Sequence, residues 1–221
     1  MLKPKRKITR KEIKRDPFLE TIENLEISFE QNKKTFLNIA LCLIAGIFII
    51  NFLLKKQAQK STDSNAALGL AMIAFENRDY ENAKFQFETI ISEFSGTVAF
   101  STANFYVGRI YFENKQFIES ESYLNTFMKY GDPEIVYFGA IKMLAHIALQ
   151  NNQYDKAIKL LDNGSKNVLK NNSIELKLIK TLVLKDQGKT DKAKSMLGEI
   201  ISQEKLPMHL KQKSEELIGM M

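Results

Sequence analysis

Four stretches of the chain repeat one pattern, and this repetition limits the possible folds more than any other feature. The stretches are ENRDYENAKFQFETI, ENKQFIESESYLNTF, QNNQYDKAIKLLDNG and DQGKTDKAKSMLGEI. A small residue occupies the same place in each, at Ala83, Ser120, Ala157 and Ala193, with separations of 37, 37 and 36 residues. Repeats in this range are typical of stacked helical hairpins. We therefore predict four pairs of antiparallel helices, with small residues where the two helices of a pair cross.

The first helix of each predicted pair has its own small residue at the matching place. These residues are Ala71, Gly108 and Ala145, with Thr181 in the fourth copy. An aromatic residue opens the second helix in three copies, at Tyr80, Phe117 and Tyr154, and Thr190 takes this place in the fourth. The predicted repeats are 66–97, 98–132, 133–172 and 173–206. Because Pro is favoured at the first position of a helix, Pro207 predicts a last helix, 207–219, that caps the stack.

The amino-acid composition agrees with an all-α fold. The chain has four Pro, ten Gly and no Trp, beside many Lys, Glu, Leu, Ile and Ala. Long unbranched side chains and Ala lose little rotamer freedom in a helix. The predicted fold class is all-α, with one N-terminal transmembrane helix followed by an α-solenoid of about four hairpins and a capping helix.

Residues 36–54 read FLNIALCLIAGIFIINFLL and contain no charged residue. At ~1.5 Å per residue, this run matches a hydrocarbon core of about 30 Å. Lysine pairs flank it on both sides, whereas a buried core helix would need a partner for every face. A cleaved signal peptide is disfavoured because the run starts far into the chain and no small-x-small site follows. We predict a membrane span at 36–54, a polar linker at 55–65 and a domain at 66–221.

The distribution of charge predicts the orientation of this span. Residues 1–34 carry ten Lys and Arg, while the fifteen residues after the span carry three. The positive-inside rule then predicts a cytoplasmic N-terminus and a C-terminal domain on the other side of the membrane, which in a Gram-negative cell is the periplasm. Residues 55–221 carry 22 Lys and Arg against 20 Asp and Glu, so the net charge of +6 does not predict a nucleic-acid partner.

The basic tail, 1–35, also contains a predicted amphipathic helix at 17–32. Pro17 suits its first turn, and the apolar residues Phe18, Ile22, Leu25 and Phe29 recur at helical spacing. Four glutamates, Glu20, Glu23, Glu26 and Glu30, lie on the other side of this helix. Two interpretations stay open for this helix, contact with the membrane surface and pairing with a partner helix.

Nearly the whole chain resembles a bacterial group of tetratricopeptide repeat proteins. The resemblance rests on a tail like KITRKEIKRDPFLETIENL, the single span, and units reading SEFSGTVAFSTANFYVGRIYF and KLIKTLVLKDQGKTDKA. This family includes the ancillary subunit of the Sec translocon and shares its domain type with a cell-division coordinator of the envelope. The resemblance implies a protein of the bacterial inner (plasma) membrane. Its periplasmic repeats would contact translocon components and periplasmic chaperones near emerging secreted chains.

The sequence is poor in groups that carry catalysis. His146 and His209 are its two histidines, and no HExxH motif, cysteine pair, nucleotide-binding glycine motif or nucleophile elbow occurs. The single cysteine, Cys42, lies inside the apolar run, where a thiol behaves as a small hydrophobe. We therefore expect a protein that is not an enzyme, with no catalytic residues, no cofactor and no metal site.

Stacked hairpins present a concave surface that is lined by the first helix of each pair. The repeat register predicts that its inward-facing residues are Met72, Phe75, Phe105, Arg109, Phe112, Lys142, His146 and Leu149. They describe an apolar groove with a basic side that binds other proteins. A second interpretation stays open, in which several of these aromatic residues are core between adjacent hairpins.

These observations favour a membrane-tethered scaffold or chaperone-like subunit at the secretion machinery. The alternative is a scaffold for envelope assembly or cell division that uses the same domain. An enzyme accessory subunit or a weak hydrolase is disfavoured because catalytic groups are missing. The sequence leaves the partner and the oligomeric state open.

Overall fold

The computed structural model describes residues 32–131 and 133–221, and every regular element in these ranges is an α-helix. The all-α prediction is confirmed for this part of the chain. The predicted amphipathic helix of the tail lies, except for its last residue, outside the described residues. The helices are α2 (Lys33–Glu76), α3 (Tyr80–Glu93), α4 (Val98–Glu113), α5 (Phe117–Tyr130), α6 (Pro133–Gln150), α7 (Tyr154–Ser165), α8 (Lys170–Asp186), α9 (Thr190–Ile201) and α10 (Met208–Gly219).

The chain divides into two compact units, Met1–Gln57 and Ala58–Met221. The described part of the first unit is mainly the beginning of α2, whose large apolar side chains are exposed, Phe48 by 72%. Within the described ranges, α2 alone is long and apolar enough to cross a membrane. This finding rests on length and composition.

Residues 55–65, predicted as a polar linker, are helical and belong to α2. The stretch KKQAQKSTDSN contains neither Pro nor Gly, the two residues that interrupt helices most strongly. Polarity alone does not end a helix, because a solvent-exposed helix tolerates polar side chains on every face. The helix α2 ends at Glu76, and the turn that follows it begins at Asn77.

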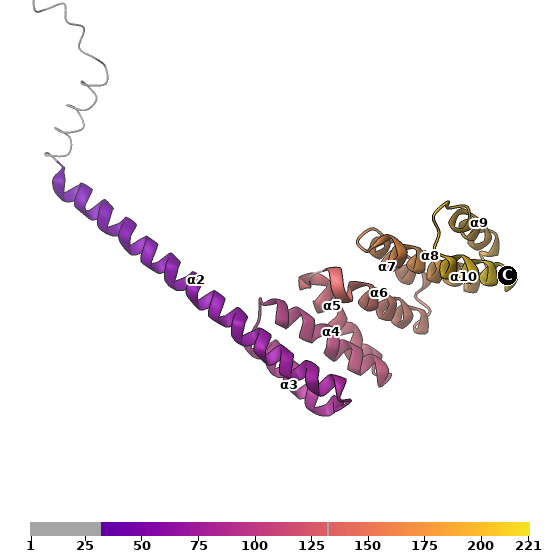
Figure 1. Cartoon of the computed structure of the whole chain (residues 1–221), viewed down its shortest axis with the longest axis horizontal. Helices are drawn as coiled ribbons and strands as arrows, with labels where there is room; N and C mark the ends of the chain where they lie inside the picture. Colours follow the sequence, from indigo (N-terminus) through magenta and orange to yellow (C-terminus); the bar gives the residue numbers. More distant parts are fainter. Residues whose placement is uncertain (1–31, 132) are drawn as a thin grey trace, which may run out of the picture. The chain divides into compact units, whose positions relative to one another are not determined.

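The second unit is a series of helical hairpins (Figure 1). The C-terminal part of α2 pairs with α3, and the following pairs are α4 with α5, α6 with α7, and α8 with α9. The first three predicted repeat ranges each contain one such pair, with only the C-terminal part of α2 in the first. The fourth range, 173–206, omits the first three residues of α8, which begins at Lys170. The helix predicted from Pro207 is α10, which contacts α9 and α8.

The turn inside each hairpin has the same length and the same backbone shape. Three residues separate the two helices in all four pairs, and the middle residue has a positive φ. These middle residues are Arg78 (63°), Lys115 (60°), Asn152 (57°) and Gly188 (74°). Backbone N–H groups of each turn donate to carbonyls of the preceding helix, so a left-handed residue closes every first helix.

The small residues predicted at the helix crossings are all buried. Their positions are Ala71, Ala83, Gly108, Ser120, Ala145, Ala157, Thr181 and Ala193. In the second hairpin, the Ser120 hydroxyl donates to the Gly108 carbonyl oxygen at 2.8 Å. Close approach of two backbones requires short side chains at both places. The repeat register that was read from the sequence is therefore correct at these positions.

Four buried apolar clusters run along the series, and each joins neighbouring elements. The first joins the end of α2 and α3 to α4, through Phe87, Ile90, Val107 and Ile110. The last joins α8 and α9 to α10, which buries Leu210, Ser214 and Leu217. Stability in such an array comes from contacts between adjacent repeats, so each hairpin depends on its neighbours.

We predict that Gly108→Leu destabilises the second unit. A Cβ atom at Gly108 would lie 2.8 Å from Leu124 Cγ and 3.3 Å from the Leu124 backbone nitrogen. Overpacking of this kind costs about 1 to 3 kcal/mol. Chemical denaturation of residues 58–221 measures the loss in unfolding free energy.

Gly198→Ala is the matched control, because a Cβ atom at Gly198 in α9 has nothing within 4 Å. We expect this variant to be more stable by about 0.5 to 1 kcal/mol, since Gly weakens a helix interior relative to Ala. An unchanged denaturation midpoint for Gly108→Leu would contradict the assigned crossing.

Lys115→Gly should stabilise the protein. Lys115 is exposed and holds a φ of 60°, a conformation that costs an L-residue about 1 to 2 kcal/mol. Glycine removes that strain, which stabilises the folded state, but it also raises the entropy of the unfolded chain, which offsets part of the gain. We therefore expect a net increase in unfolding free energy of about 0.5 kcal/mol. The converse change, Gly188→Ala, should lower the melting temperature. If both variants melt like the wild type, the turns do not hold this conformation in solution.

Candidate functional site

An open groove lies between the first helices of the second and third hairpins, α4 and α6. Its volume is about 400 Å³. The lining residues are Phe105, Arg109 and Phe112 from α4, and Phe138, Gly139, Lys142, Met143 and His146 from α6. Both helices contribute residues at spacings of three and four, so one face of each helix borders the groove.

The floor of the groove is apolar and fixed by packing. Phe105 is only 5% exposed, and its ring lies 5.5 Å from that of Phe127 in an edge-to-face contact. A Cβ atom on Gly139 would lie 3.4 Å from the Phe105 ring, so a glycine here leaves that part of the floor open. Phe105 is thus a core residue that closes the bottom of the groove.

The rim of the groove is cationic. Arg109, Lys142 and His146 supply its titratable side chains, and none of the described lining residues is acidic. Arg109 Nε donates to Glu113 Oε1 at 2.8 Å, and both side chains remain 43% exposed. An exposed pair of this type contributes little to stability. The guanidinium is therefore available to a second carboxylate.

Aromatic contacts hold the side chains of the rim in place. The His146 ring makes edge-to-face contacts with Phe112 at 5.4 Å and with Phe117 at 6.0 Å. The Lys142 ammonium lies over the Phe138 ring at 4.9 Å. These contacts order two half-buried rings, Phe112 and Phe138, that border the open space. Ordered aromatic side chains lose little entropy when a partner binds.

Five of the eight residues predicted from the repeat register line this groove, and three do not. Met72 and Phe75 pack on the core of the first hairpin, and Leu149 packs on the cluster of the third. The Phe75 ring contacts Tyr106 edge to face at 5.0 Å and carries the Arg109 guanidinium on its face at 5.1 Å. Phe75 thus holds the Arg109 guanidinium in position through a cation–π contact.

Three residues that line the groove were not predicted from the sequence: Phe138, Gly139 and Met143. Phe138 lies four residues before Lys142, so extending the register by one helical turn towards the N-terminus would have found it. Gly139 and Met143 carry no signal of their own in the sequence. Their importance comes from the neighbouring Phe105 ring.

Tyr106 lies behind the groove and belongs to the aromatic core. Its ring stacks on Phe87 at 5.2 Å. Burial raises the pKa of the Tyr106 hydroxyl, while the nearby Arg109 charge acts in the opposite direction. The phenol therefore stays neutral at physiological pH and serves packing.

The described residues show no sign of a metal site or of an unoccupied polar ligand site. They contain no group of three or more His, Cys, Asp or Glu side chains that could hold a metal ion. None of their buried side-chain polar atoms lacks a hydrogen-bond partner. An unsatisfied buried group is a common sign of a missing ligand. The groove thus offers apolar contact and positive charge to a ligand.

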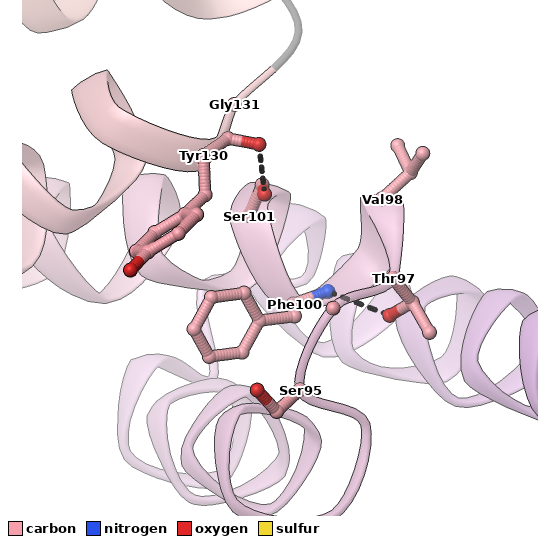
Figure 2. A pocket seen from close by; sticks show the side chains of 8 residues that line it. Ser95, Thr97, Val98, Phe100, Ser101, Tyr130 and Gly131 are labelled. Atoms are coloured by element: carbon pink, nitrogen blue, oxygen red, sulfur yellow. Dashed lines mark hydrogen bonds between the residues drawn. The ribbon is translucent and has the colours of Figure 1, made fainter.

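A second hollow lies where α4 begins and α5 ends (Figure 2). Its polar groups already serve the fold. Thr97 Oγ1 accepts from the Phe100 backbone N–H at 3.2 Å, and the Ser101 hydroxyl donates to the Tyr130 carbonyl oxygen at 2.8 Å. The Phe100 and Tyr130 rings meet edge to face across it. The residues that line this hollow cap the N-terminus of α4 and join α4 to the end of α5.

Comparisons with solved structures agree with this architecture. The crystal structure of YrrB, described as a TPR protein with an unusual peptide-binding site, covers 68% of this chain and 84% of its own, with 14% identity and a TM-score of 0.52. A putative kinesin light chain of Podosopora anserina with nearly identical TPR-like repeats covers 72% and 85%, with 15% identity and a TM-score of 0.55. At these identities, the likeness concerns the fold alone.

Sequence comparisons identify the family. The search of curated proteins found no match. A profile of the tetratricopeptide repeat-like domain matches residues 28–206, which include all four hairpins. The regular hairpins, the buried small residues at their crossings and this match agree, and the chain therefore belongs to the tetratricopeptide repeat-like domain family.

Proposed function

We propose that this protein is a membrane-anchored scaffold whose α4–α6 groove binds extended apolar segments of other proteins. The observation that carries the proposal is the groove itself, with an apolar floor, two half-buried aromatic rings and a cationic rim. Tetratricopeptide repeat proteins generally act as interaction scaffolds, which supports a role in binding over one in catalysis.

The groove favours a segment with apolar side chains and at least one carboxylate. Aromatic and Arg side chains dominate the affinity of many protein interfaces, and Phe112, Phe138 and Arg109 are of these types. A carboxylate of the ligand can accept charge-assisted hydrogen bonds from Arg109 or Lys142. The peptide-binding site ascribed to YrrB makes a peptide ligand a reasonable choice for this fold.

Membrane anchoring by residues 36–54 is supported by the physical character of α2. Its large apolar side chains are exposed along this stretch, a cost that a bilayer removes. Asn51 donates from its side-chain amide to the Ile47 carbonyl oxygen at 3.0 Å, so this polar group has a partner inside its own helix. The charge asymmetry favours a cytoplasmic tail and repeats on the other side of the membrane. The resemblance to a bacterial inner-membrane family supports the periplasm as that side.

A place at the secretion machinery follows from the resemblance of the sequence to the ancillary subunit of the Sec translocon. The partners would be translocon components, periplasmic chaperones or secreted clients. A membrane anchor raises the effective concentration of the groove near emerging chains, so modest contacts suffice. The alternative role, in envelope assembly or division, differs in the partners that the groove would contact.

Site-specific photocrosslinking in living cells tests the groove. A photoreactive amino acid at position 112 or 138 should crosslink to translocon components, chaperones or secreted chains, because both side chains border the open space. Position 119, on the exposed side of α5, is the control. Equal crosslinking from position 119, or none from the groove while the protein stays folded, would refute the proposed surface. Crosslinks to division or cell-wall proteins would select the alternative role.

Substitutions in the groove should weaken capture without unfolding the protein. We expect Phe112→Ala or Arg109→Ala to reduce binding of a crosslinked client by about 1 to 3 kcal/mol. Phe105→Ala is unsuitable as a binding variant, because Phe105 is core and its loss would lower stability. Melting temperatures of the purified variants separate the two effects.

The proposed topology predicts a specific protease pattern. In spheroplasts with an intact inner membrane, external protease should digest residues 57–221 and spare a reporter fused to the N-terminus. The reason is the ten-to-three asymmetry of Lys and Arg around the span. Protection of the C-terminal domain under these conditions would reverse the assignment.

A further inference from the structure

The first hairpin has an apolar outer face, which is built by the C-terminal part of α2 and by α3. We call the residues Ala67, Leu70, Ile73 and Phe85 the first-hairpin face. Leu70 is 64% exposed, Ile73 57% and Phe85 69%. A hollow of about 600 Å³ lies among them. This face is separate from the α4–α6 groove.

The repeat register shows what this face would meet inside the array. The residues 37 positions after Leu70 and Ile73 are Val107, which is fully buried, and Ile110, which is 3% exposed. They pack on Phe87 and other residues of the preceding hairpin. In the third hairpin, the equivalents Leu144 and Ile147 are again buried. A helix therefore covers these positions in the second and third hairpins, and no hairpin precedes the first in the described chain.

Phe85 is independent evidence that the first-hairpin face is a contact surface. The equivalent residues in the other three hairpins are Ser122, Lys159 and Ser195, which are all exposed and polar. The fold therefore does not require an apolar side chain here. An exposed phenylalanine at a place where three sister repeats carry polar residues is typical of a contact surface.

The charge around the face indicates the kind of helix that fits. Asp79 and Glu93 are the charged residues that line the hollow, beside the amides Asn77, Asn82 and Gln86. Residues 58–93 carry three Lys and Arg against six Asp and Glu, whereas residues 94–221 carry 17 against 14. The first hairpin is thus the acidic part of a basic chain, and it favours a basic partner.

We propose that the first-hairpin face binds an amphipathic helix of another protein that carries Lys or Arg beside its apolar stripe. A second copy of this chain is a poorer fit, because it would bring two acidic faces together. The far end of the array is a poorer fit too, since the outer side of α10 presents mainly polar residues. The glutamate-rich stretch 17–32 of the tail has the wrong charge as well.

Binding of a synthetic helix to the full chain in phosphatidylcholine nanodiscs tests this proposal. The probe is a labelled peptide of about 18 residues with a leucine stripe at helical spacing and lysines beside it. The matched probe carries glutamate in place of lysine. Fluorescence anisotropy should give binding of the lysine peptide that weakens with salt, and about tenfold weaker binding of the glutamate peptide.

The chain itself supplies the variants. Leu70→Lys uses the residue found at the equivalent place of the fourth hairpin, Lys180, and Phe85→Ser uses that of the second, Ser122. Each should weaken binding of the lysine peptide about tenfold or more. Ile118→Ser, at an 85% exposed site on α5, is the control and should bind like the wild type. Phe112→Ala should also bind like the wild type, which separates this face from the groove.

Three results would overturn the proposal. The first is wild-type affinity in both Leu70→Lys and Phe85→Ser while their melting temperatures are unchanged. The second is equal affinity for the lysine and glutamate peptides. The third is efficient disulfide crosslinking between two copies of Ile73→Cys that Phe85→Ser abolishes, because the face would then belong to a homodimer.

Discussion

The structure of the second unit depends on the close approach of two helices within each hairpin. Short side chains at both sides of every crossing permit this approach, and the Ser120 hydroxyl uses it to reach the Gly108 carbonyl. Because the two backbones are close, bulky residues beside the crossing, such as Phe87 and Leu124, fill the space between consecutive hairpins and are fully buried. The same spacing repeated four times produces a row of adjoining apolar clusters from units that could not bury enough surface alone.

The identical turns give this repetition its precision. A left-handed residue in the middle of each three-residue turn closes one helix and starts the next in the same direction every time. Gly188 adopts this conformation without strain, whereas Arg78 and Lys115 adopt it at a cost. The cost is tolerated because the two packed helices fix both ends of the turn. Local backbone strain here is offset by burial in the crossings.

Stacking also determines where binding surfaces can form. Within the array, the first helices of adjacent hairpins border a groove, and its character follows from which side chains the register turns outward, such as Arg109 and Lys142. At the start of the array, no hairpin among the described residues covers the stacking face, and Leu70 and Ile73 are exposed. The two proposed surfaces thus arise from one geometric rule, applied inside the array and at its end.

The sequence by itself determined the helical class, from composition, and the number of hairpins and the positions of the crossings, because these follow from the repeat of 36 to 37 residues and from residue size. It also predicted five residues of the groove from the register. It did not predict that residues 55–65 are helical, since composition alone does not locate the end of a helix. Whether Phe105 is exposed or buried, and whether Gly139 leaves room beside it, was decided only by the packing of α4 against α6. Burial of this kind depends on residues about 35 positions apart, and only the tertiary structure brings them into contact.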